Sequence, residues 1–263
     1  MSFYEPEIRS SDPSTVGWDS DYNGVQWFNS STGERKYWYN NNIYICATIE
    51  PSSIPPSSFD FESGWEYSYG SDVLDNGRWS GTINSPDVTG SVKNSGNYAL
   101  TTSNVTNYIY KQFYGIVDCY ARAYIRLTSM PTIDNQEFVI MRLSKASETT
   151  IFTNLVLGRY SSVNKWNVQY YNNGMYNDNR STLYSPSSNT WYCVELNYKC
   201  GNGDGEVHCY IDGNELTDVG HIGLQSNYTA GSERFGIGNL WSAYSTTIYI
   251  DDVAINDSYI GTI

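Results

Sequence analysis

The stretch CYARAYIRL, residues 119–127, decides the fold class of this 263-residue chain. Small or apolar residues occupy every second position from Cys119 to Leu127. The positions between them hold Tyr120, Arg122, Tyr124 and Arg126. Successive side chains of a β-strand point to opposite faces, so this period of two places the first set in a core and the second on the other face. The stretch therefore predicts a strand of an antiparallel sheet that is buried on one side.

A second stretch predicts a β-hairpin further along the chain. WYCVELNYKC (191–200) and EVHCYID (206–212) alternate in the same way and are separated by the turn sequence GNGDG. The side chains expected in the core are Val194, Leu196, Tyr198, Val207, Cys209 and Ile211. Those expected together on the outer face are Glu195, Asn197, Lys199, Glu206, His208 and Tyr210. The apolar runs 138–143 and 153–160 predict more fully buried strands, followed by the alternating stretch 165–171.

The composition supports an all-β protein. Charged residues make up only 16% of the chain, while 25 tyrosines, 8 tryptophans and 22 glycines are present. Aromatic residues favour strands, and Gly, Asn and Ser favour the turns between them. The length allows one large β domain with a small appendage, whose core needs no disulfide framework. The five cysteines are irregularly spaced and predict none.

Three segments carry a resemblance to a known fold. They are FDFESGWEYS (59–68), SGNYALTTS (95–103) and TTIYIDDVAI (246–255), and the hairpin described above adds a fourth. Together they resemble the opening, closing and middle strands of concanavalin A-like and carbohydrate-binding-module jelly rolls. The resemblance covers about residues 59–260 and implies an antiparallel two-sheet jelly-roll sandwich, whose surface contacts glycans or other molecules.

The region before this domain predicts a small β-hairpin. Its strands are Val25–Asn29 and Glu34–Tyr39, joined by a turn at Ser30–Gly33. The hairpin resembles those near the ends of phage tail-fibre and head-decoration proteins. The matching residues are Trp27, Phe28, Asn29, Thr32, Gly33, Tyr37 and Trp38. The resemblance implies attachment to a particle or to sister copies through Trp27, Phe28, Tyr37 and Trp38; an ordinary hairpin docked on its own domain is the alternative.

A proline-rich segment predicts the domain boundary. EPSSIPPSSF (50–59) contains three prolines and four serines, which disfavour a helix or a central strand and favour a linker. We therefore expect an attachment region with its linker at residues 1–57, and a jelly-roll domain at residues 58–263.

Charge and hydropathy narrow the classes of partner. The net charge is −13 and the sequence pI is about 4.4, so phosphate-rich nucleic acids and anionic membranes are poor partners. The N-terminal sequence MSFYEPEIRSSDPS lacks the basic and apolar regions of a signal peptide, and no apolar run is long enough to span a bilayer. A carbohydrate-binding domain without an export signal fits a virion protein, which is assembled in the cytoplasm.

The sequence predicts a protein that is not an enzyme, with no catalytic residues. Glycosidases need a pair of suitably spaced carboxylates, but the glucanase signature E-x-D-x-x-E is absent. Polysaccharide lyases of this fold use a His/Tyr pair with Arg, whereas His208 and His221 are the only two histidines and lack that context. A lyase or glucanase with an unrecognised site remains the alternative.

Acidic residues at the two ends of the domain indicate a structural calcium site. In many carbohydrate-binding jelly rolls, a Glu near the opening Phe and an Asp of the last strand share a calcium ion, and calcium prefers six to eight oxygen ligands. By this resemblance the candidate ligands are Glu62 together with Asp251 or Asp252, and Asp60 as a helper. The alternative is that these acids cap strands and turns beside solvent.

One polar surface is the candidate glycan-binding site. Tyrosine rings stack on sugar C–H faces, while Arg, Asn and Gln donate hydrogen bonds to hydroxyls. The residues expected on this surface are Tyr120, Arg122, Tyr124, Arg126, Asn167, Gln169, Tyr171, His208 and Tyr210. The alternative is an ordinary solvated sheet face, which carries the same residue types.

The leading functional hypothesis is a non-enzymatic virion component, either a capsid-decoration protein or a head or tail fibre. The N-terminal region would bind other virion proteins, with a homotrimer implied by the resemblance. The jelly roll would be displayed at the virion surface to engage host or environmental glycans. The alternative is a carbohydrate-binding module of a cell-surface or polysaccharide-processing system.

Overall fold

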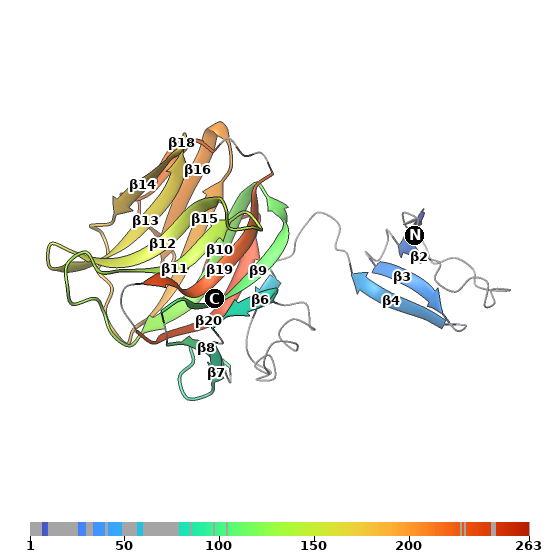
Figure 1. Ribbon diagram of the computed structural model, residues 1–263, viewed down its shortest axis with the longest axis horizontal. Helices are drawn as coiled ribbons and strands as arrows, with labels where there is room; N and C mark the ends of the chain where they lie inside the picture. The colour runs from blue at the N-terminus through green and yellow to red at the C-terminus, as the bar shows by residue number, and fades with distance from the viewer. Residues whose placement is uncertain are drawn as a thin grey trace. The chain divides into compact units, whose positions relative to one another are not determined.

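The protein is built of β-strands in two compact units, Met1–Pro55 and Pro56–Ile263 (Figure 1). The computed structural model describes residues 79–84, 86–96, 98–103, 105–226, 228, 230–242 and 246–262, without the side chains of 114 and 242, and the backbone of strands 7–9, 26–29, 34–39, 42–48 and 57–59. No helix occurs in these ranges, so none there crosses a membrane.

The N-terminal unit contains a four-stranded sheet in the order β1-β2-β3-β4. Its strands are β1 (Glu7–Arg9), β2 (Gln26–Asn29), β3 (Glu34–Tyr39) and β4 (Asn42–Thr48). β2 and β3 form the antiparallel hairpin that the sequence predicts, with β2 starting one residue later. β4 extends this hairpin into a meander, and β1 pairs with β2 in parallel.

The C-terminal unit is an antiparallel sandwich of a nine-stranded and a seven-stranded sheet (Figure 1). The nine-stranded sheet contains β5 (Ser57–Phe59), β7 (Asp87–Thr89), β8 (Ala99–Thr102), β10 (Asp118–Leu127), β15 (Trp191–Lys199), β16 (Asn202–Ile211), β17 (Asn214–Glu215), β18 (His221–Gln225) and β20 (Ile248–Asn256). The seven-stranded sheet contains β6 (Gly81–Ile83), β9 (Asn107–Ile116), β11 (Glu137–Ser144), β12 (Ile151–Tyr160), β13 (Val163–Asn172), β14 (Met175–Arg180) and β19 (Ser232–Ser242). The predicted all-β, two-sheet architecture is therefore confirmed.

The core lies between the two sheets, and the predicted alternation of β10 supplies part of it. Cys119, Ala121, Ala123, Ile125 and Leu127 are all 0% exposed. The predicted hairpin is confirmed as β15–β16, whose register pairs Val194 with Ile211, Leu196 with Cys209, and Tyr198 with Val207. The same register places Glu195 beside Tyr210 and Asn197 beside His208 on the outer face, as expected. The period of two thus decides which side of each strand is buried.

Two boundaries differ from the sequence-based expectation. Ser57–Phe59, at the end of the predicted linker, forms β5 and pairs with Val253–Ile255 of β20. These three residues follow the last proline of the segment, so each retains the backbone N–H that a strand needs. β16 begins at Asn202 rather than at Glu206, because residues 202–207 pair with β18 across two register shifts.

The cysteines of the sandwich are buried thiols. Cys119, Cys193, Cys200 and Cys209 are free and lie in the interior. Burial raises the pKa of the Cys193 and Cys200 thiols to about 11. These cysteines therefore act as small apolar core residues.

Candidate functional site

The strand β13 shows which side of the seven-stranded sheet is turned away from the core. Trp166 packs edge-on against Tyr192 of β15, with ring centroids 5.6 Å apart, so it points between the sheets. Val168 and Tyr170 share its face because they follow at steps of two. The intervening residues of β13 therefore lie on the opposite, outer face; they are Asn167, Gln169 and Tyr171.

Four side chains on this outer face form a hydrogen-bonded row across four neighbouring strands. The row consists of Arg142 (β11), Asn154 (β12), Gln169 (β13) and Asp178 (β14), and we call it the polar ladder. Arg142 Nε donates to Asn154 Oδ1 at 2.9 Å, Asn154 Nδ2 to Gln169 Oε1 at 3.2 Å, and Gln169 Nε2 to Asp178 Oδ1 at 3.4 Å. Each pair is in direct register, so the ladder is built by cross-strand neighbours.

The Asp178 end of the polar ladder is closed by local partners. Asp178 accepts a hydrogen bond from Asn167 and forms an ion pair with Arg180 at 2.9 Å. The guanidinium of Arg180 also lies 3.9 Å from the centroid of the Tyr160 ring. The Tyr160 hydroxyl in turn donates to Glu137. Charges at this end of the ladder are therefore paired within the sheet.

At the Arg142 end of the polar ladder, part of the guanidinium has no hydrogen-bond partner among the described residues. Among the described residues, Asn154 is the hydrogen-bond partner of Nε, and the two Nη nitrogens have none. Burial lowers the pKa of the Arg142 guanidinium, an effect that nearby Glu148 and Tyr176 oppose. The register partner of Arg142 on β19 is Gly236, which offers no side chain. Arg142 is thus a partly buried cation with free donors.

A second group of side chains lies close to Arg142. Glu148 accepts a hydrogen bond from the Tyr108 hydroxyl at 3.3 Å and pairs with Arg234 Nη2 at 3.1 Å. The Arg234 guanidinium also stacks over the Tyr110 ring at 3.5 Å. The charge of Glu148 is therefore already used by Arg234 and Tyr108.

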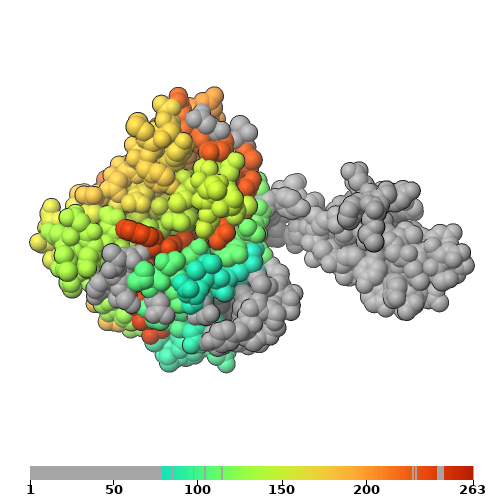
Figure 2. All heavy atoms as spheres, in the orientation of Figure 1, coloured from blue at the N-terminus to red at the C-terminus, as the bar shows by residue number. Residues whose placement is uncertain are grey.

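Two tyrosine rings lie next to Gln169 and Asp178 of the polar ladder, two residues further along β13 and two residues earlier on β14. Tyr171 and Tyr176 are register partners on β13 and β14, and their rings meet edge to face with centroids 6.1 Å apart. Tyr176 is 50% exposed and donates its hydroxyl to Ile151 O at 2.9 Å. Burial raises the pKa of Tyr176, although Arg142 opposes the shift, so this hydroxyl keeps its proton. β13 and β14 (gold) and β6 (cyan) lie on the side of the sandwich that Figure 2 shows.

The nine predicted ligand-binding residues do not form one surface. Asn167, Gln169 and Tyr171 lie on the seven-stranded sheet. The other six lie on β10 and β16 of the nine-stranded sheet, and they are Tyr120, Arg122, Tyr124, Arg126, His208 and Tyr210. The sequence order of the strands does not reveal which sheet each strand joins, and this is the reason for the error.

Arg122, which the sequence places on an open face, is only 4% exposed. A segment that follows β20 covers it, since Arg122 Nη1 donates to Gly261 O at 3.1 Å. Arg122 Nη2 donates to Asp252 O, within β20, at 3.2 Å. Beside it, buried Glu195 accepts hydrogen bonds from the backbone N–H groups of Ile260 and Gly261 at 2.8 and 2.9 Å. Residues 257–262, which we call the C-terminal cover, therefore bind both Arg122 and its register partner Glu195.

The remaining predicted residues of β10 and β16 also have partners within the chain. Tyr259 of the C-terminal cover lies against Tyr210 and Tyr120, with ring centroids 4.8 and 6.5 Å apart. Arg126 donates to the main-chain and side-chain oxygens of Asn189. Tyr124 lies beside Arg122, whose Cζ is 6.0 Å from the ring centroid. This face is therefore largely organised by contacts of the protein with itself.

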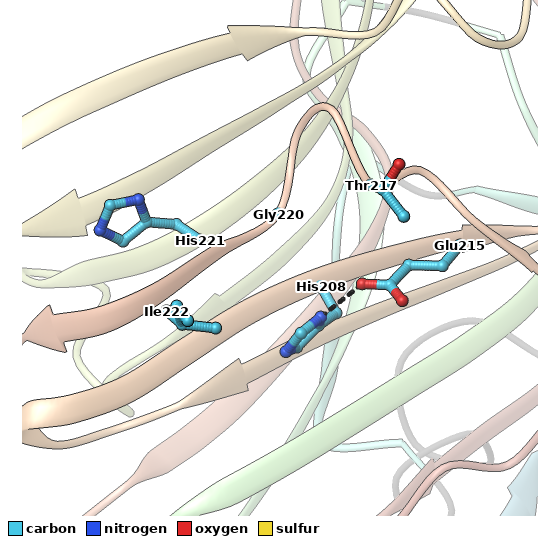
Figure 3. Close-up of a pocket in the computed structure, with 6 residues that line it drawn as sticks. All are labelled: His208, Glu215, Thr217, Gly220, His221 and Ile222. Carbon is cyan, nitrogen blue, oxygen red and sulfur yellow. Dashed lines mark hydrogen bonds and ion pairs between the residues drawn. The ribbon is translucent and has the colours of Figure 1, made fainter.

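His208 lines a pocket at the edge of the nine-stranded sheet (Figure 3). The pocket has a volume of about 340 Å³, and its lining residues are His208, Glu215, Thr217, Gly220, His221 and Ile222. His208 Nδ1 lies 2.7 Å from Glu215 Oε1, and Nε2 lies 3.2 Å from Glu206 Oε2. Figure 3 shows the His208 ring turned toward Glu215, with His221 at a distance from both. Both nitrogens of His208 are thus engaged within the protein.

The proposed calcium ligands are placed only in part. Asp251 and Asp252 lie in β20, and Asp60 and Glu62 lie outside the described residues. Asp251 Oδ2 accepts from the backbone N–H of Asn94 at 2.8 Å, and Asp252 accepts from the side chains of Asn94 and Ser95. Burial raises the pKa of Asp251 to about 6. No group of three metal-ligating side chains occurs among the residues described, although two adjacent buried carboxylates suit a hard cation in charge and donor type.

The proposed attachment residues lie on the N-terminal sheet. Trp27 and Phe28 belong to β2 and Tyr37 and Trp38 to β3, where Trp27 is opposite Lys36 and Tyr37 is opposite Gln26. Their side chains lie outside the described part of the chain. Their role in attachment stays a prediction.

Sequence reasoning missed the residues that extend the ladder beyond β13. Arg142 lies within the apolar run FVIMRL and Asn154 within TNLVLGRY, and both runs predict strands buried on both sides. β11 and β12 are indeed mostly buried. A single Arg or Asn within an apolar run is the signal that could have identified an outward-facing polar row.

Comparisons with known proteins support the fold. No protein-family model and no curated protein matches the chain. Among solved structures, it is similar to the cellulose-induced protein Cip1 (TM-score 0.54, 18% identity, covering 78% of this chain and 99% of that one). It is also similar to the alginate lyase Aly36B (TM-score 0.56, 11% identity, 79% of this chain and 98% of that one). The C-terminal unit thus has a jelly-roll sandwich fold that carbohydrate-related proteins share.

Proposed function

We propose that the C-terminal sandwich is a non-catalytic carbohydrate-binding domain, and that its ligand lies along the outer face of the seven-stranded sheet. The observation that carries this proposal is the polar ladder with its bordering tyrosines. Guanidinium, amide and carboxylate groups repeat there at the separation of neighbouring strands, about 4.8 Å. Such a row offers donors and acceptors to successive hydroxyl groups, while the half-exposed ring of Tyr176 offers a surface for sugar C–H groups.

The pairing of the carboxylates on this face favours binding over catalysis. Asp178 is held by Asn167 and Arg180, Glu137 by Tyr160, and Glu148 by Arg234. A general acid or base has to exchange its proton with the substrate, which such partners hinder. Support also comes from the fold, since the structures with similar folds include Cip1 and an Aly36B variant in complex with an alginate tetrasaccharide (TM-score 0.53).

A binding assay tests this proposal. The full chain is run by affinity electrophoresis through gels that contain a panel of neutral and acidic polysaccharides. At least one polysaccharide is expected to retard it. Gln169→Ala and Asn154→Ala are expected to weaken binding about tenfold, a change of about 1.4 kcal/mol. Each substitution removes one hydrogen-bonding side chain of the polar ladder. Gln225→Ala, at an exposed glutamine of the other sheet, is the matched control.

Three outcomes would contradict the proposal. Retardation by no member of the panel would remove the binding function. Equal affinity of the wild type and both ladder variants would place the ligand elsewhere. Release of reducing ends or of unsaturated products from any polysaccharide would show catalysis.

For the whole chain, we propose that this domain is displayed on a virion. Support comes from the resemblance of the N-terminal hairpin, carried by Trp27, Phe28, Tyr37 and Trp38, to fibre and decoration proteins. The N-terminal sheet would attach a homotrimer to capsid or tail proteins. Mass spectrometry of purified virions tests this placement, and absence of the protein from virions of cultures that express it would exclude it.

A carbohydrate-binding module of a cell-surface or polysaccharide-processing system is the second candidate. The similarity of the sandwich to Cip1 and to an alginate lyase favours it. Recovery of the protein from the cell-surface fraction rather than from virions would support this candidate.

A further inference from the structure

We infer that the sugar bound on this face carries a negatively charged group, a carboxylate or a sulfate, and that Arg142 binds that group. This inference rests on the proposed function and specifies the chemical class of its ligand. It adds a charge requirement that a row of amides alone would not impose.

The partners of the arginines distinguish Arg142 from the others. Six arginines have described side chains, and five of them bind a carboxylate or a main-chain carbonyl oxygen. These five are Arg122 (Gly261 and Asp252), Arg126 (Asn189), Arg159 (Asp134), Arg180 (Asp178) and Arg234 (Glu148). Arg142 binds only the neutral side-chain oxygen of Asn154. Among the described arginines, its guanidinium is the one without such an oxygen partner.

A guanidinium in this setting requires an anion for physical reasons. Moving a cation out of water is unfavourable unless an opposite charge or several acceptors replace the water. Arg142 is partly buried, and its Nη nitrogens have no acceptor among the described residues. The two Nη groups form a planar pair of donors, which matches the two oxygens of a carboxylate or sulfate.

The surroundings of Arg142 do not already supply this anion. Glu148 is close enough to influence Arg142, but its carboxylate is shared between Arg234 and the Tyr108 hydroxyl. Arg234 adds a second positive charge near the same place. The cluster of Arg142, Arg234 and Glu148 therefore carries a net positive charge of one, on a chain whose formal net charge is −13.

The negative net charge of the protein provides a test of this inference, through the salt dependence of binding. A strongly acidic protein repels polyanions at long range, so a preference for an acidic polysaccharide has to arise from local contacts. Adding salt would weaken a non-specific attraction, whereas the contact of a partly buried guanidinium is screened much less. The preference is therefore expected to persist at physiological salt.

The experiment compares polysaccharides that differ only in charge. Titration calorimetry on the full chain uses polygalacturonate and alginate, each beside its esterified form, and a sulfated galactan beside its desulfated form. At least one charged polymer is expected to bind about tenfold more tightly than its neutral counterpart, as a charge-assisted contact would give. Whether the carboxylated or the sulfated pair shows this difference identifies the anion.

Variants of Arg142 connect the preference to this residue. Arg142→Gln is expected to reduce the ratio of charged-form to neutral-form affinity from about tenfold to about one, whatever its effect on binding of the neutral form. Arg142→Lys keeps the charge but not the paired donors, and is expected to retain part of the preference. Arg126→Gln, at an arginine of the other sheet bound to Asn189, is the matched control. Circular dichroism confirms that each variant is folded.

The outcomes separate this inference from the proposed function. Equal binding of charged and neutral forms overturns the inference and leaves carbohydrate binding intact. A preference that survives in Arg142→Gln also overturns it. Binding of polyglutamate as tight as that of polygalacturonate would show simple ion exchange and overturn it as well. Only the failure of every polymer to bind would remove the proposed function together with the inference.

Discussion

Arg122 and Arg142 lie on the central strands of the two sheets, and they have opposite surroundings. β10 lies in the middle of the nine-stranded sheet and β11 in the middle of the seven-stranded sheet. On β10, Arg122 is covered by residues 257–262, lies in register with Glu195, and donates to two carbonyl oxygens. On β11, Arg142 donates to one amide oxygen and keeps two donor groups without a described partner.

Under the proposed function, Arg122 stabilises the fold and Arg142 binds a ligand. The contacts of Arg122 come from the chain itself, so the free energy of those contacts contributes to folding. The contacts of Arg142 are incomplete, so an external ligand is able to supply the rest. A buried arginine is therefore informative about function only when its partners have been identified.

The largest expected difference is between the unfolding free energies of the Arg122→Ala and Arg142→Ala variants. Arg122→Ala removes two hydrogen bonds to carbonyl oxygens and the positive charge beside buried Glu195, and we expect a loss of about 3 kcal/mol of unfolding free energy. Arg142→Ala breaks no ion pair among the described residues, and we expect a loss below about 1 kcal/mol. Urea denaturation monitored by tryptophan fluorescence measures both values. Similar losses for the two variants would refute the assigned difference.

The pH dependence of stability tests whether the Asp251 carboxyl of β20 is buried as described. Burial raises the folded-state pKa of Asp251 to about 6, above its ordinary value of 3.8. Protonated Asp251 is therefore favoured by folding, and its stabilising contribution is present below pH 3.8 and lost as the pH rises through about 6. The Asp251→Asn side chain cannot ionise. The stability of this variant relative to the wild type should therefore increase as the pH rises from 3.8 to about 6. A constant difference between the two proteins would contradict the assignment.

Calcium would alter this pH response if it binds beside Asp251 and Asp252. A cation that binds only the folded protein raises the melting temperature and favours the ionised carboxylates. We expect the melting temperature at pH 7.5 to be a few degrees higher in about 1 mM calcium than in EDTA. Asp252→Asn should reduce this difference. Identical melting curves in calcium and EDTA would exclude the site.

The smallest effect is expected at the closed end of the ladder. The ion pair of Arg180 with Asp178 joins side chains that are 44% and 37% exposed, and such pairs contribute about 0–1 kcal/mol. Arg180→Ala should therefore change the unfolding free energy little, in contrast to Arg122→Ala. A loss comparable to that of Arg122→Ala would show that the two faces do not differ as described.

Local pattern was sufficient to predict much of the fold. The alternation of β10 and of the β15–β16 hairpin identifies the core-facing residues, because each strand has one buried face and a period of two. The polar residues of Asn167–Tyr171 were also recognised as candidates. Their assignment to the same surface as Tyr120 failed, because two strands with identical patterns can belong to different sheets.

The parts that could not be predicted depend on contacts between distant segments. Nothing in the sequence of residues 257–262 indicates that they cover Arg122, since the contact joins residues 139 positions apart. The polar ladder likewise requires the register of four strands, which is set by bulges and turns outside the local pattern. Arg142 is identified as a candidate binding residue only when the side chains around it are known.

The position of β20 has a consequence for how the protein is made. β20 lies between β10 and β8 and also pairs with β5, so it joins segments from across the whole unit. While the ribosome is still synthesising residues 248–256, the edge of β10 has no partner on that side. Folding of the sandwich must therefore finish after these residues emerge, and such long-range pairing is slow. During that interval the open edge is exposed to aggregation, and chaperones would increase the yield of soluble protein.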